Sequence, residues 1–137
     1  MRPLENDAFQ KILSDWLNKA TLDLKSAQAL LSHDPPLLYP ACFHCQQAAE
    51  KYLKAFLTLK QIEFPKTHII EELLDLIYTV DEGLAARLAT AARLTPYGVD
   101  IRYPADQREP GAEQAREAME LAALVRDSIM PIVQRHF

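Results

Sequence analysis

The sequence has few glycines, few cysteines and no long apolar run, and each shortage excludes a class of protein. With only three glycines, it lacks the glycine-rich loop that cradles phosphates in many nucleotide-binding proteins. Two cysteines, Cys42 and Cys45, cannot build the disulfide framework of a small secreted domain. No apolar run approaches the roughly 20 residues that span a bilayer, and the opening "MRPLENDAFQ" lacks an apolar signal core. We therefore expect a cytoplasmic protein with reduced thiols and no membrane contact.

The composition also lacks a positive charge excess. The formal net charge is −4, so no global basic field attracts nucleic acid, and any nucleotide or nucleic-acid site must be a local patch. Apolar residues make up 49% and charged residues 25% of the chain, as in ordinary globular proteins. A length of 137 residues fits a single domain, residues 1–137. Leu, Ala, Glu, Gln and Lys are abundant, which favours helix over strand.

Apolar residues recur at helical spacing in most of the chain. We predict helices over residues 7–31 and 40–61, a third that Thr67 caps, a fourth that begins after Asp81 and reaches Leu94, and a fifth from Ala112 to the end. Residues 95–111 contain three prolines and two glycines, so this stretch should be irregular. The sequence thus predicts an all-α fold, an antiparallel up-and-down bundle of four to five helices.

The predicted helix over 40–61 carries two stripes. Cys42, Cys45, Ala49, Tyr52 and Phe56 recur every three or four residues, as expected of a face buried in the core. A second set at similar spacing, with Glu50 beside it, is polar; this polar stripe comprises His44, Gln47, Lys51 and Lys54.

The polar stripe allows two interpretations. Two lysines one turn apart, with a histidine and an amide as further donors, could bind a phosphate or a nucleotide. A solvated helix face with an ordinary Glu50–Lys54 pair would show the same pattern. Cys42 and Cys45 lie on one face of the predicted helix and His44 lies on another, and no second pair of metal-binding residues is nearby in the sequence. We therefore expect buried cysteines and no metal site.

Two other segments contain candidate ligand-binding residues. In "PYGVDIRYP", Arg102 lies between Ile101 and Tyr103, where it could present a guanidinium to a phosphate or form a purely structural ion pair. His68 lies at the start of a predicted helix and could donate to an anion there or simply complete a cap.

These segments together resemble the HEPN family of helical domains. The resemblance covers about Asp7 to Val133 and rests on three blocks in order, "FHCQQAAEKYLKAFL", "FPKTHIIEELL" and "DIRYP". It implies a bundle of about five helices that usually dimerises, often encoded beside a minimal nucleotidyltransferase, in several cases as a toxin–antitoxin pair. In such pairs the HEPN chain has been viewed as the subunit that binds substrate or nucleotide. Many other members are metal-independent RNases with an Arg followed by a His after four to six residues.

The chain departs from that RNase signature, because none of its arginines has a histidine at this distance; after Arg102 the relevant positions hold Gln107, Arg108 and Glu109. RNA cleavage by acid–base catalysis needs a group that exchanges protons near neutral pH, usually a histidine. His44 or His68 could substitute only if the fold brought one of them beside Arg102.

We therefore predict a non-catalytic subunit that binds a nucleotide or a nucleic-acid phosphate group, without a cofactor. We expect it to form a homodimer and to act with a minimal nucleotidyltransferase. The predicted ligand-binding residues are His44, Gln47, Lys51, Lys54, His68, Arg102 and Tyr103. Two alternatives stay open: an RNase toxin with a degenerate site, and a pure protein-interaction module.

Overall fold

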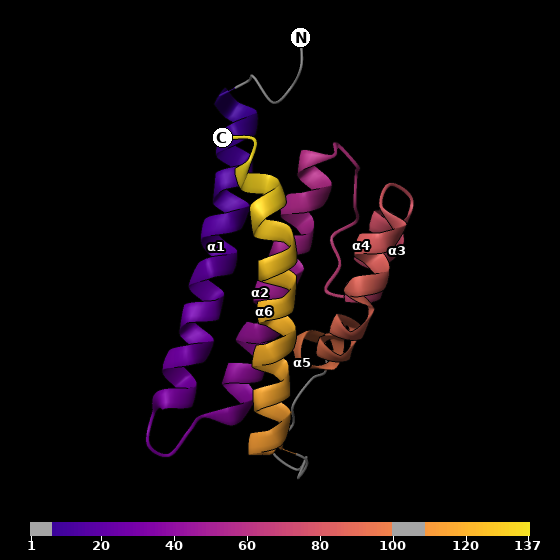
Figure 1. The fold of residues 1–137 in the computed structure, drawn as a ribbon. Helices are drawn as coiled ribbons and strands as arrows, with labels where there is room; N and C mark the ends of the chain where they lie inside the picture. The colour runs from indigo at the N-terminus through magenta and orange to yellow at the C-terminus, as the bar shows by residue number, and fades with distance from the viewer. Residues whose placement is uncertain (1–6, 100–108) are drawn as a thin grey trace.

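The computed structural model describes residues 7–99 and 109–137, and every regular element in these ranges is a helix (Figure 1). The elements are α1 (Asp7–Ser32), α2 (Leu38–Leu59), α3 (Ile70–Tyr78), α4 (Glu82–Arg87), the 3₁₀ helix η2 (Ala89–Leu94), α5 (Thr95–Val99) and α6 (Ala112–Gln134). The predicted all-α bundle is confirmed.

Of the three long helices, α2 is the central one, and α1 and α6 both pack against it (Figure 1). Of its 22 residues, 14 are buried, whereas α1 buries only one stripe, from Leu13 to Ala27. The predicted apolar stripe of α2 is confirmed as core, since all five of its side chains are at most 1% exposed. Residues 60–69 return along the bundle (Figure 1). Helices α3, η2 and α5 pack on the side of α2 that faces away from α1, and α4 packs on α3 and η2 (Figure 1).

The predicted fourth helix is divided into α4 and η2. Asp81 caps α4 as expected, because its carboxylate accepts a hydrogen bond from the backbone N–H of Leu84 at 3.0 Å. Beyond Leu88 the chain tightens to 3₁₀ geometry, with three residues per turn. Leu88, Ala91 and Leu94 are spaced by three and are all fully buried, so the tighter turn keeps them on one face.

Two other predicted boundaries were wrong. Thr67 does not cap α3; its hydroxyl accepts from the backbone N–H of Ile69, and the helix begins at Ile70. Residues 95–99 are not irregular but form α5, because Pro96 lies in the first turn, where a proline costs no helical hydrogen bond. Arg102 and Tyr103 lie outside the described residues.

Among the residues that the structure describes, no helix combines the length and the apolar character needed to cross a membrane.

Candidate functional site

A carboxylate on α1 contacts two basic residues of the polar stripe. One oxygen of Asp23 lies 2.9 Å from Nδ1 of His44, and its other oxygen accepts from the ammonium of Lys51 at 2.5 Å. The side chains of His44 and Lys51 remain 32% and 22% exposed, whereas that of Asp23 is 13% exposed. We call these three residues the Asp23 cluster. Because Asp23 engages Nδ1, the Nε2 atom is the imidazole nitrogen left for a further partner.

A second carboxylate, Glu50, organises the other basic residues of the stripe. Its two oxygens lie 2.8 Å from the ammonium of Lys54 and 2.8 Å from Nδ1 of His68. Glu50 and Lys54 are only 3% and 7% exposed, whereas the side chain of His68 is 58% exposed. The ammonium also lies 5.8 Å from the ring centroids of Trp16 and Phe64, a distance at which cations attract aromatic faces. The charge of Lys54 is therefore neutralised inside the fold.

Two glutamines extend the contacts around Glu50. The amide nitrogen of Gln47 donates to the amide oxygen of Gln46 at 2.6 Å. Gln46 in turn donates to the backbone carbonyl of His68 at 2.8 Å and to Glu50 at 3.3 Å. Gln46 is fully buried and packs directly against Gly98 of α5. Gln46, Glu50, Lys54 and His68, which we call the Glu50 cluster, thus hold α2, α5 and the segment before α3 together.

The structure places five of the seven predicted residues in two separate groups of contacts. His44 and Lys51 contact Asp23, whereas Lys54 and His68 contact Glu50, to which Gln47 is linked through Gln46. The arrangement is not the solvated helix face of the alternative interpretation, because Lys54 is buried and the others are tied to carboxylates or amides. The remaining two, Arg102 and Tyr103, lie outside the described residues.

The sequence interpretation missed Asp23 and Gln46. Asp23 follows Ala20 by three residues and precedes Ala27 by four, and both alanines are fully buried. A carboxylate beside buried apolar positions could have indicated that Asp23 pairs with a basic residue of another helix. Gln46 likewise follows Cys42 by four residues, which places it on the buried face of α2.

The cysteines are free and buried, as expected. Burial raises the pKa of Cys42 to about 11, although a hydrogen bond with Tyr97 lowers it slightly. Burial, with a smaller contribution from Cys42, raises the pKa of Cys45 to about 12. The Cys45 sulfur contacts that of Met119 at 3.4 Å. These are packing thiols with very little thiolate at neutral pH. Within the described ranges, no group of three or more His, Cys, Asp or Glu side chains could hold a metal ion.

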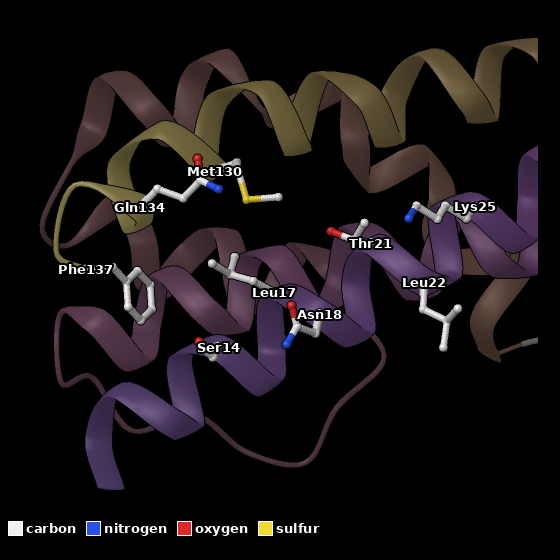
Figure 2. Close-up of a pocket in the computed structure, with 9 residues that line it drawn as sticks. All are labelled: Ser14, Leu17, Asn18, Thr21, Leu22, Lys25, Met130, Gln134 and Phe137. Atoms are coloured by element: carbon white, nitrogen blue, oxygen red, sulfur yellow. The ribbon is translucent and has the colours of Figure 1, made fainter. Parts of the chain in front are cut away.

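An open groove of about 750 Å³ separates α1 from the last turns of α6 (Figure 2). Leu17 and Leu22 of α1 contribute apolar surface, and Met130 and Phe137 contribute it from the opposite side. Lys25 lies at one end of the groove. None of the five predicted site residues that the structure describes lines this groove, so it is separate from the polar stripe.

Comparison with known proteins places this arrangement in a family. The profile of the HEPN domain matches residues 13–131. The structure is similar to the crystal structure of TT1696 from Thermus thermophilus, with a TM-score of 0.62 and 31% identity, covering 91% of this chain and 98% of that chain. It is also similar to ST0689, an archaeal HEPN homologue, with a TM-score of 0.54 and 26% identity, covering 90% of this chain and 93% of that one. No curated protein matches the chain. The chain belongs to the HEPN family.

Proposed function

We propose that the chain is a non-catalytic subunit that binds a phosphate group of a nucleotide or nucleic acid along the polar stripe of α2. The observation that carries this proposal is the sharing of Asp23 by His44 and Lys51. One carboxylate orients both side chains, and both remain partly exposed. Donors held in place in advance lose little conformational entropy when an anion binds.

The charge balance of the site sets its expected strength. Asp23 offsets Lys51, and Glu50 offsets Lys54, so the two pairs carry no net charge, and only His44 and His68 add positive charge when protonated. A site of this kind binds through oriented hydrogen bonds more than through a strong field. In this proposal Lys54 and Glu50 support the site from inside. Arg102 and Tyr103 stay predicted ligand contacts.

The family supports the rest of the proposal. The HEPN resemblance implies a homodimer and a minimal nucleotidyltransferase as partner, in several cases within a toxin–antitoxin pair. We infer that the chain presents its bound phosphate to such a partner. Light scattering of the purified chain, alone and with a nucleotidyltransferase encoded beside it, would measure both associations, with a mass of two chains expected for the isolated protein.

Calorimetric titration of the purified chain with inorganic tripolyphosphate tests the phosphate site. We expect binding by the wild-type protein and a loss of about tenfold or more in Lys51→Met, because a hydrogen bond to a charged group contributes about 1.5–3 kcal/mol. Lys19→Met removes an exposed lysine of α1 and is the matched control, which should bind as wild type does. Absence of binding by the wild-type chain, or an equal loss in both variants, would reject the phosphate site.

Metal-independent RNA cleavage is a second candidate, and the hydrogen bond between Asp23 and His44 is the observation that favours it. A carboxylate on Nδ1 fixes the imidazole so that Nε2 can accept a proton, as a general base requires. Incubation of a structured RNA with wild type, His44→Gln and Arg102→Ala distinguishes the candidates. Cleavage that both substitutions abolish would establish an RNase, whereas an intact RNA supports the binding subunit.

A further inference from the structure

An aromatic side chain with no place in the core adjoins the polar stripe. Phe43 of α2 is 36% exposed, and it is neither in the core of the described residues nor among the apolar side chains that pack against it. Single exposed apolar residues are common and by themselves indicate nothing. Phe43 differs from the others in its position, because its sequence neighbour His44 belongs to the Asp23 cluster.

The ring of Phe43 is supported from one side. Its centroid lies 5.4 Å from that of His44, and the two rings meet edge to face at 79°. This is a favourable aromatic geometry. Asp23 fixes the imidazole through Nδ1, so the partner of the phenyl ring is itself held in place. An aromatic platform that is both partly open and supported can receive a second flat group with little loss of entropy.

Helical register aligns Phe43 with the proposed phosphate site. Phe43, Gln47 and Lys51 are spaced by four residues, so they form one row on α2. At 1.5 Å of rise per residue, Phe43 and Lys51 are about 12 Å apart along the helix axis, with His44 between them. A nucleoside triphosphate is a flat base joined through a sugar to a chain of phosphates. Such a ligand could place its base on Phe43 and extend its phosphates past His44 towards Lys51.

We propose that Phe43 is a stacking platform for the nucleobase of a nucleotide whose phosphates contact His44 and Lys51. This inference rests on the proposed phosphate site and adds the residue that receives the base, with a nucleotide as the ligand. Stacking on an aromatic side chain tolerates every base, because each base has a π-face. The platform therefore predicts a preference for nucleotides over inorganic polyphosphate without strong selection among bases.

Paired titrations with ATP and inorganic tripolyphosphate test the platform on the full chain. In Phe43→Leu we expect ATP to bind about five- to tenfold more weakly, the lower end of measured base–aromatic stacking, with tripolyphosphate binding unchanged within about twofold. Phe43→Tyr keeps the ring and should retain the affinity for ATP. Tyr78→Leu is the matched control, because Tyr78 is an exposed aromatic of α3 outside the stripe, and it should change neither affinity.

The outcomes separate the two proposals. Suppose that the wild-type chain binds tripolyphosphate. If Phe43→Leu then weakens the binding of ATP and of tripolyphosphate equally, or weakens the binding of neither, the stacking platform is wrong and the phosphate site stands. If the wild-type chain binds neither ligand, the phosphate site itself fails, and the platform fails with it. Melting temperatures of all variants, measured by circular dichroism, show that each compared protein is folded.

Discussion

At the scale of single residues, the ion pair between Glu50 and Lys54 is the most buried charge pair described. Its side chains are 4% and 8% exposed, and Glu50 also accepts from His68 and Gln46. Taking charges out of water is costly, and a buried charge is tolerated mainly when its partner is in place. The sequence showed the i,i+4 spacing of this pair, but not its burial, because burial depends on Trp16 and Phe64, which come from other segments.

Removing one charge of this pair should therefore strongly destabilise the protein. We expect Glu50→Gln to lower the free energy of unfolding by roughly 3–5 kcal/mol, because the Lys54 ammonium loses its counter-charge in a buried position. Urea denaturation measures this loss. Asp15→Asn disrupts the exposed pair with Lys11 and should cost less than about 1 kcal/mol. The double variant Glu50→Gln/Lys54→Met should regain much of the loss. Similar small losses in Glu50→Gln and Asp15→Asn would contradict the structural role of the pair.

The thiols give a pH-dependent prediction. Burial raises the pKa values of Cys42 and Cys45 to about 11 and 12, so at pH 8 the native protein should react with iodoacetamide far more slowly than the protein in denaturant does. Because the pKa values are raised in the folded state, these thiols favour folding at neutral pH. That contribution declines as the pH rises from the ordinary thiol range towards 11–12. Rapid alkylation of the native protein at pH 8 would show that the thiols are accessible.

At the scale of elements, the long helices were predictable and the short ones were not. Predicted boundaries of 7–31 and 40–61 agree with α1 and α2 within about two residues, because the proline pair Pro35–Pro36 separates the two periodic patterns. The division into α4 and η2 and the existence of α5 depend on packing against α2 and α3. The spacing of apolar residues within one segment does not indicate these tertiary contacts.

The contact of α5 with α2 gives a prediction at this scale. A Cβ added at Gly98 would overlap the buried side chain of Gln46, so Gly98→Ala should destabilise the protein by about 1–3 kcal/mol. A Cβ added at Gly83, in α4, would lie 3.8 Å from a carboxylate oxygen of Asp81, which is an ordinary van der Waals distance. Alanine is the better helix former, so Gly83→Ala should be stabilising by up to about 1 kcal/mol. Chemical denaturation compares the two variants.

The double variant Gln46→Ala/Gly98→Ala provides the check on this explanation. If the overlap is the cause, Gly98→Ala should cost less in the Gln46→Ala background than in the wild-type background. The explanation would be excluded if Gly98→Ala lowered the free energy of unfolding equally in both backgrounds. It would also be excluded if Gly98→Ala stabilised the protein and Gly83→Ala destabilised it.

At the scale of the whole molecule, the sequence predicted a polar stripe but not how its charges are balanced. His44, Gln47, Lys51 and Lys54 were placed on one stripe by helical spacing alone. Asp23 of α1 pairs with His44 and Lys51, and Gln46 on the buried face of α2 accepts from Gln47. A single carboxylate among apolar positions gives little indication of which distant side chain it will meet. The predicted homodimer and the predicted nucleotidyltransferase partner depend on other chains and stay predictions.

The most direct measurement of the proposed phosphate site is a titration of the ¹⁵N-labelled chain with ATP, followed by backbone amide chemical shifts. Binding along the polar stripe predicts the largest, saturable shifts at residues 43–51 of α2 and around Asp23 of α1, and their loss in Lys51→Met. Saturable shifts confined to the groove between α1 and α6, or no saturable shift up to millimolar ATP, would contradict it.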